Sequence, residues 1–543
     1  MSVKKILALF TVTFTMIPVV KSQDMEDAKQ LIENGRYTSA EKLLEKNIGT
    51  DAPEPEANYL LVKTYLEQEK TEEAARFVNK YLQAAEDGDA DPLNRIAATR
   101  YLLNAGNKRA ADEIFNSILT NRKYNKNVSL LLAMAEVAVE EKNGDAWDAL
   151  TWLDLAEKKD RRNPDIEIVR GLAYRKLKDA NNAYIAFQQA IKKDPRNARA
   201  HYLLGKIFTA QKNPEIYMEH FEKAYMIDST YAPVLEALYN HYYFRNVQTA
   251  KKFLGKYIAN SDYSIQNDYY MTDLLYLNGE YQEAVRSANE IIGKEQEKTQ
   301  PRIFKLAAYA YTNSGDSAKA LSYMKRYFEK ETPEKVIAAD FRLIAQLTEK
   351  VAGQEEAAIS YYSISTEMDT VIANKAANAS VIAELYKKTG NNAARAEWLG
   401  KYYGWKDRAG NVDLFNWGLA WYLAKDYRKT DSVFTIYTTR YPDDIYGYYW
   451  RAQANASIDT AMADSLAIPF YRNVVAVGEK NKEANKKMLL KAYAYLGGYE
   501  ANITKNYEVS LAWFEKYIEM EENARISTYI EMLHKWMAER NKE

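Results

Sequence analysis

Four histidines are the first residues to examine for chemistry, because imidazole is a common metal ligand and general base. They are His201, His220, His241 and His534. None belongs to an H-E-x-x-H arrangement, and no two are spaced as metal ligands on one helical turn. His201 is expected to pack between helices as a core histidine. The sequence therefore predicts no histidine-based metal site or catalytic site.

Other catalytic arrangements are also missing from the sequence. The chain contains no cysteine, which excludes thiolate metal ligands, disulfides and cysteine nucleophiles. It contains no G-x-S-x-G elbow, no phosphate-binding glycine loop and no dinucleotide fingerprint. Carboxylates are plentiful, but on amphipathic helices they ordinarily form solvated faces. We therefore expect a protein that is not an enzyme and that needs no cofactor.

A pattern of 34 residues organises the elements of the chain. Each of three residues recurs at this spacing: Gly171 and Gly205, Phe187 and Phe221, Ala190 and Ala224. A small residue followed by an aromatic and an alanine at these positions predicts a helix–turn–helix unit. The small residue lets two helices approach closely, and the ring fills the space between stacked pairs. Looser copies extend this pattern over nearly the whole chain.

These residues resemble the tetratricopeptide repeat (TPR) family. The resemblance implies an all-α, right-handed superhelical solenoid of antiparallel helix pairs, with a C-terminal capping helix at about 524–540. It also implies a scaffold for protein–protein interaction, since such a solenoid supplies a binding surface and no chemistry of its own. The unit with a long loop between Trp450 and Tyr471 looks like exported repeat proteins of Bacteroidota.

In TPR proteins the first helix of each pair lines a concave groove. Carried over to this sequence, the resemblance assigns six residues to that groove: Tyr202, Lys206, Arg302, Lys305, Tyr309 and Arg342. Aromatic rings alternating with Lys and Arg suit a peptide or an acidic tail, because rings give contact area and cations bind carboxylates. The alternative is an ordinary solvated inner face with partly structural tyrosines. We expect a protein or peptide partner.

Tyrosine is abundant, with 44 residues against 16 phenylalanines. Rows such as residues 446–450, with sequence YGYYW, would stack on sugars if they were exposed. The alternative function is therefore a carbohydrate-linked binding protein at the outer membrane that uses exposed Tyr and Trp. Most rings are expected to be structural, since the repeat places Tyr between helices with its hydroxyl at the rim.

A second pattern is Asp followed by Ser or Thr and then a small or aliphatic residue. Its hydroxyl residues are Ser229, Ser317, Thr370, Ser432, Thr460 and Ser465. The triplet resembles the O-glycosylation acceptor of exported Bacteroidota proteins, and it makes these six residues candidate glycosylation sites. The alternative is that Asp-Ser and Asp-Thr are good helix starts, which a chain of many short helices needs repeatedly.

Charge and the first residues indicate where the protein acts. The 74 basic and 75 acidic residues balance, which argues against nucleic acid or anionic lipid as the main partner. Residues 1–22 have the basic start and apolar run of a signal peptide, the alternative being a membrane anchor. No later stretch is apolar enough to span a membrane. We expect an exported, periplasmic protein, or alternatively a surface or secreted one, that associates with an outer-membrane assembly.

Two glycines, Gly404 and Gly410, and a run of charge interrupt the apolar period late in the chain. They predict a break between an N-terminal array at 23–403 and a C-terminal array at 411–543 that ends in the capping helix.

Overall fold

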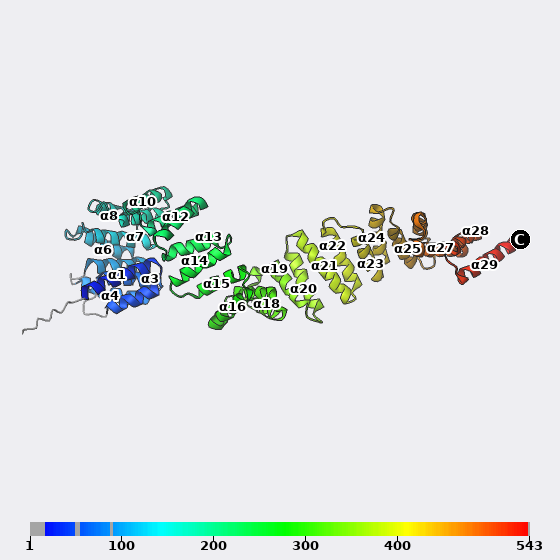
Figure 1. The fold of residues 1–543 in the computed structure, drawn as a ribbon, viewed down its shortest axis with the longest axis horizontal. Helices are drawn as coiled ribbons and strands as arrows, with labels where there is room; N and C mark the ends of the chain where they lie inside the picture. Colours follow the sequence, from blue (N-terminus) through cyan, green and yellow to red (C-terminus); the bar gives the residue numbers. More distant parts are fainter. Residues whose placement is uncertain (1–16, 49–54, 87–90, 541–543) are drawn as a thin grey trace, which may run out of the picture. The chain divides into compact units, whose positions relative to one another are not determined.

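The computed structural model describes residues 17–48, 55–86 and 91–540, and these residues form 29 α-helices and no strand (Figure 1). The chain divides into two compact units, Met1–Thr299 and Gln300–Glu543. The predicted signal peptide lies mainly outside the described residues, which include only its residues 17–22, at the start of α1.

The helices of the first unit are α1 (Ile17–Glu33), α2 (Tyr37–Ile48), α3 (Pro55–Glu67), α4 (Thr71–Glu86), α5 (Pro92–Asn104), α6 (Lys108–Thr120), α7 (Val128–Glu140), α8 (Ala146–Glu157), α9 (Pro164–Lys176), α10 (Ala180–Lys193), α11 (Ala198–Ala210), α12 (Pro214–Ile227), α13 (Ala232–Tyr242), α14 (Val247–Ala259), α15 (Ile265–Leu277), α16 (Tyr281–Glu295) and the short turn η1 (Gln296–Lys298).

The helices of the second unit are α17 (Pro301–Asn313), α18 (Ser317–Lys330), η2 (Pro333–Lys335), α19 (Ala338–Thr348), α20 (Glu355–Met368), α21 (Ile372–Lys388), α22 (Asn392–Trp405), α23 (Asn411–Leu423), α24 (Tyr427–Arg440), α25 (Ile445–Ile458), α26 (Ile468–Gly478), η3 (Glu479–Asn481), α27 (Lys486–Tyr499), the π-helical turn η4 (Glu500–Thr504), α28 (Tyr507–Met520) and α29 (Ala524–Arg540).

Within each unit, every odd-numbered helix packs against the even-numbered helix that follows it. The predicted all-α array of helix pairs is confirmed, and α29 stands alone at 524–540, where the capping helix was predicted. We call the side of a unit formed by the odd-numbered helices its odd-helix face. It corresponds to the groove-lining first helices of the TPR resemblance.

The small residue of the repeat is required because an aromatic ring occupies the space beside it. A Cβ atom added to the glycine would lie 2.3–2.8 Å from ring carbons in four pairs: Gly171 with Phe187, Gly205 with Phe221, Gly418 with Phe434, and Gly497 with Phe514. Real Cβ atoms do not approach other atoms so closely, since interiors are close-packed. The spacing that identified the repeat in the sequence therefore reflects direct contact between paired helices.

Three turns between paired helices have a left-handed glycine followed by a capping side chain, at Gly106, Gly315 and Gly390. Gly315 has a φ of +88°, a conformation that residues with a Cβ adopt only with strain. The next residue, Asp316, then accepts a hydrogen bond from the backbone N–H of Lys319 at 3.0 Å and begins α18. In this turn the residue after the glycine is the N-cap of the second helix.

The predicted break at Gly404–Gly410 falls inside the second unit, in the loop between α22 and α23. There Lys406 Nζ binds the carboxylate of Asp413 at 2.9 and 3.0 Å, and the same carboxylate accepts the backbone N–H of Gly410 at 2.8 Å. The division into arrays at 23–403 and 411–543 stays a prediction.

Candidate binding faces of the two units

The repeat supplies a common register for the six predicted groove residues. In α11, α17 and α19 the small repeat residue is Gly205, Ala308 and Ala345, respectively. Five of the predicted residues stand three positions before or one position after it: Tyr202 and Lys206, Lys305 and Tyr309, and Arg342. We call these register positions −3 and +1. The sixth residue, Arg302, lies in the first turn of α17.

In the first unit, the two predicted residues differ in role. Tyr202 is half-buried, and its ring lies 6.0 Å from that of Phe221 and 5.6 Å from that of Tyr231. Burial raises the pKa of Tyr202, and the nearby Glu236 carboxylate adds to the effect. Lys206, one turn later, is exposed. Tyr202 is therefore mainly a packing residue, whereas Lys206 faces solvent.

In the second unit, two of the predicted cations hold acidic side chains: Lys305 binds an acid of the following helix pair, and Arg342 binds the acid that ends the second helix of its own pair. Lys305 Nζ lies 2.7 Å from Oδ1 of Asp340, a residue with no solvent exposure. Arg342 donates from Nε to Oδ1 of Asn378 at 3.2 Å and from one Nη to Asp369. The side chains of Lys305 and Arg342 stay 29% and 23% exposed. These cations are thus fixed in position and still reach the surface.

Asp340 receives further donors that explain why a carboxylate is buried there. The Tyr327 hydroxyl donates to it at 3.1 Å, and the backbone N–H of Ile337 donates at 3.2 Å. Burial raises the pKa of Tyr327, and the charge of Asp340 raises it further. Arg302 and Tyr309 lie half-buried on the same helix as Lys305. The structure therefore brings Arg302, Lys305 and Tyr309 together on α17.

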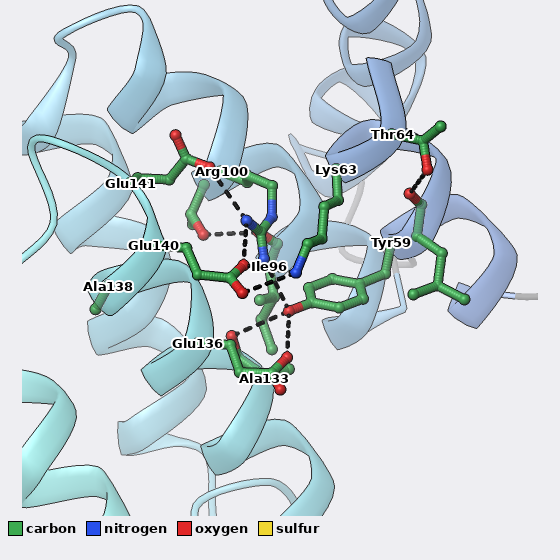
Figure 2. A network of polar contacts seen from close by, with 12 residues as sticks. Tyr59, Lys63, Thr64, Ile96, Arg100, Ala133, Glu136, Ala138, Glu140 and Glu141 are labelled. Atoms are coloured by element: carbon green, nitrogen blue, oxygen red, sulfur yellow. Dashed lines mark hydrogen bonds and ion pairs between the residues drawn. The ribbon is translucent and has the colours of Figure 1, made fainter. Parts of the chain in front are cut away.

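Sequence reasoning missed a polar network on the odd-helix face of the first unit (Figure 2). Arg100 in α5 is only 1% exposed and donates from Nη1 to Glu140 at 2.8 Å and to Glu141 at 3.1 Å. Lys63 in α3 binds both oxygens of Glu140 at 2.8 and 2.9 Å. The only signal in the sequence is charge on the first helices of pairs about 40 residues apart.

Tyr59 completes this network. Through Arg100 it connects Glu136 and Glu140 of α7, whose pKa values shift in opposite directions. Its hydroxyl donates to Glu136 at 3.0 Å and accepts from Arg100 at 3.2 Å. Burial, and then the charge of Glu140, raise the pKa of Glu136. Burial also acts to raise the pKa of Glu140, but Lys63 and Arg100 outweigh it and lower that pKa. The charges of this face are therefore largely satisfied by one another.

In the first unit, two helix-capping contacts join the region around the turn between α1 and α2 to the later helices α13 to α15. The Asp262 carboxylate, from the loop between α14 and α15, accepts the backbone N–H of Thr38 at 2.7 Å and the hydroxyl of Ser39 at 2.5 Å. In return, Asn34 Oδ1 accepts the first backbone N–H of α13, at Ala232, at 2.7 Å. Backbone N–H groups at a helix start attract such oxygens. These partners are about 200 residues apart, so no local pattern reveals them.

The six candidate glycosylation residues do not share one structural setting. Only Asp316 caps a helix, so the helix-start explanation accounts for Ser317 alone. The hydroxyl residues Ser229, Thr370, Ser432 and Thr460 are exposed. Ser317 accepts from Lys350 at 3.1 Å, and Ser465 lies 2.8 Å from the Tyr499 hydroxyl. Glycosylation at these positions stays a prediction.

His201 lies in the core between α11 and α12, as the sequence predicted. It is 7% exposed, and its Nδ1 lies 3.3 Å from Nδ1 of His220. Burial, and then the neighbouring His220, lower the pKa of His201 to about 4. Within residues 17–48, 55–86 and 91–540, no three His, Cys, Asp or Glu side chains are grouped so as to hold a metal ion.

The tyrosine-rich segments are partly packed and partly exposed. Tyr269 has no solvent exposure, and its hydroxyl donates to the Glu295 carboxylate, whereas Tyr446 is 48% exposed. The Tyr446 ring lies 5.9 Å from that of Phe415 on the preceding odd-numbered helix. Among the helices that the structure describes, none is both long and apolar enough to cross a membrane.

Two segments match family models of tetratricopeptide repeats: residues 31–98 match one described as "Tetratricopeptide repeat", and residues 171–212 match one described as "TPR repeat". The chain thus contains tetratricopeptide repeats, and its helix pairs form a TPR-like array. Repeats of this kind generally serve protein–protein interaction and are typically non-enzymatic. No curated protein matches the sequence.

Several solved structures are similar to this chain. The C-terminal part of a TPR repeat-containing protein from Cytophaga hutchinsonii is 25% identical over 48% of this chain and 98% of that chain, with a TM-score of 0.30. A tetratricopeptide repeat protein from Parabacteroides merdae is 16% identical over 54% and 98%, with a TM-score of 0.21. Yeast Tom70 is 13% identical over 76% and 96%, with a TM-score of 0.26. These TM-scores are low, so the class rests on the matched segments and the helix pairs.

Proposed function

We propose that the protein is a non-enzymatic scaffold of the bacterial cell envelope that binds a peptide or a partner helix on the odd-helix face of its second unit. The observation that carries this proposal is the pair of anchored cations, Lys305 on Asp340 and Arg342 on Asp369. Each stands at register position −3 of consecutive odd-numbered helices. A partner segment lying across α17 and α19 would meet both.

The anchoring of these cations favours binding. Their long side chains are already ordered in the folded protein, so they lose less conformational entropy when a partner binds. An immobilised flexible side chain costs roughly 0.5–1.5 kcal/mol when an interface forms. Lys305 and Arg342 are already held by acids and keep about a quarter of their surface exposed. Their remaining donors fit carboxylate or carbonyl oxygens of a partner chain.

The first unit is the weaker candidate for the same role. Arg100, Lys63 and the acids of α7 satisfy one another, and the caps at Asp262 and Asn34 join the start of this unit to its later pairs. An incoming segment would have to displace these contacts. Lys206 remains the exposed cation of the predicted set here, so contact at α11 is a secondary expectation.

Export to the periplasm, or alternatively to the surface or medium, belongs to the same proposal and is supported by the leader-like residues 1–22. Association with an outer-membrane assembly is its expected context. Sequencing the N-terminus of the native protein checks the export step: a chain beginning near Gln23 agrees with it, and retention of Lys4 and Lys5 contradicts it.

Site-specific photo-cross-linking in cells tests the binding face. A benzophenone side chain placed at Tyr309 in α17 should capture a stoichiometric protein partner, identified by mass spectrometry. The matched control carries the same group at Lys319 on α18, whose side chain is 61% exposed on an even-numbered helix. Equal capture from both sites, or capture of glycan without protein, would contradict the proposal.

A further inference from the structure

The exposed side of the C-terminal helix α29 is mainly polar, as in a solenoid cap, and includes Ser527, Thr528, Glu531 and Lys535. Its Ile526 and Leu533 are buried against the last pair. Tyr529, Met532 and Trp536, spaced along the same helix, stay 38%, 38% and 36% exposed. The Tyr529 ring lies 6.0 Å from that of Phe514 and the Trp536 ring 5.5 Å from that of Tyr507, so both aromatic side chains stand at the junction with the last pair and remain partly accessible.

In the last pair, α27 and α28, register positions −3 and +1 carry very small side chains. Beside the repeat glycine Gly497 stand Ala494 and Gly498, where α17 carries Lys305 and Tyr309. A Cβ atom added to Gly498 would meet nothing within 4 Å, in contrast to Gly497, which lies against Phe514. The smallest side chains thus occupy the positions that hold large ones in other pairs.

A cavity of about 340 Å³ opens at this place, between α27, η4, α28 and α29. Its lining combines small residues, Ala494, Gly498 and Ala501, with four aromatic rings: Phe514, Tyr517, Tyr529 and Trp536. The π-helical turn η4 ends α27 and supplies Ala501 and Asn502 to the lining. Such turns are frequent at functional sites, and cavities above roughly 300 Å³ with apolar walls and few polar groups are typical ligand sites.

The charges around the cavity have mainly one sign. Among the described residues that line it, Arg525 alone is charged. Trp536 also lines a neighbouring cavity of about 440 Å³, together with Lys505, Arg540 and Glu539. Three cations against one acid favour an occupant that carries negative charge beside its apolar part.

We propose that this cavity binds a bulky apolar side chain, flanked by carboxylates, on a segment of the partner protein. The aromatic walls and the space above Gly498 take the apolar side chain, and Arg525, Lys505 and Arg540 bind the acids beside it. This site continues the odd-helix face to the end of the chain, so the inference rests on the proposed function and adds the partner's chemistry.

The test uses the purified full-length protein and a defined probe, the peptide acetyl-Glu-Leu-Trp-Glu-amide with 5-fluorotryptophan, followed by fluorine NMR. We expect saturable binding, at least tenfold weaker for Gly498→Leu, whose side chain fills the cavity. Gly404→Leu is the matched control, because Gly404 is likewise the penultimate residue of its helix and has nothing within 4 Å of an added Cβ. It should bind the probe as the unmodified protein does.

Two further measurements separate the parts of this inference. Arg525→Gln should weaken the acidic peptide at least threefold and leave a version with Gln in place of Glu unchanged. No saturable binding, equal binding by Gly498→Leu, or equal affinity for a Lys-flanked peptide would overturn the inference. Cross-linking from Tyr309 is independent of this cavity, so failure here and failure of the proposed function give different results.

Discussion

Lys305 of α17 binds Asp340 of α19 through both carboxylate oxygens, at 2.7 Å to Oδ1 and 2.9 Å to Oδ2. The acid is fully buried, whereas the lysine is 29% exposed. This asymmetry gives one contact two roles in the proposed function, since the acid anchors the array and the partly exposed cation is available to a partner. A substitution of the lysine therefore affects stability as well as binding.

Lys305→Met should lower the free energy of unfolding by about 2–4 kcal/mol, because it leaves the buried Asp340 charge without its cation. The lower part of this range applies if solvent screens the exposed lysine. Adding Asp340→Asn should recover part of the loss. Urea unfolding of both variants gives this comparison, and additive losses would mean that the pair is not coupled.

Gly205→Ala should destabilise the first unit by about 1–3 kcal/mol, since the new methyl group meets the Phe221 ring. The built Cβ lies 2.4 Å from a ring carbon. Gly255→Ala is the control, because its Cβ meets nothing within 4 Å and alanine favours helix by about 1 kcal/mol. Thermal unfolding compares the two variants, and a Gly205→Ala protein as stable as Gly255→Ala would refute the packing argument.

The His201–His220 contact should make stability fall in mild acid. The folded-state pKa of His201, about 4, lies below its ordinary 6.5, so the unfolded state takes up the proton first. The stabilisation is complete above pH 6.5 and is lost as the pH falls toward 4, by up to about 3 kcal/mol.

Other charges near His201 are Lys223, which also disfavours the imidazolium, and Glu219, which favours it. His201→Gln should therefore flatten the pH dependence of unfolding between pH 7 and pH 4.5, measured with urea at each pH. An unchanged slope in this variant would assign the acid sensitivity to other groups.

Asp262→Ala should loosen the start of the first unit, because Thr38 and Ser39 lose their capping oxygen. The expected cost is about 0.5–2 kcal/mol, the usual range for a lost N-cap. Hydrogen exchange should show faster exchange in α1 and α2 and little change in α5 to α8. Uniform change over the unit, or none in α2, would mean that the cap does not hold the two ends together.

Local spacing predicted much of the fold. Gly205 and Phe221 define a repeat because their contact recurs in three further helix pairs, and the apolar period predicted a helix at about 524–540, where α29 lies. The same register placed Lys305, Tyr309 and Arg342 on odd-numbered helices. These features depend on contacts within one pair or between neighbouring pairs. Such contacts recur at fixed spacings in the sequence and can therefore be recognised there.

Longer-range features could not be read in this way. Ser39 and Asp262 are 223 residues apart in the sequence but form a hydrogen bond. Their proximity in space depends on the accumulated rotation of the many helix pairs between them. The partners of Lys305 and Arg342 were missed because Asp340 and Asp369 stand at different places in their pairs. The hollow at Gly498 is visible in the sequence only when register positions are compared from pair to pair.

Hydrogen exchange on the captured complex, against the free protein, tests the central claim most directly. If the second unit binds a protein segment on its odd-helix face, partner-dependent protection should appear in α17 and α19, with α18 and α20 unchanged on their outer sides. Protection confined to even-numbered helices or to the first unit would contradict this account.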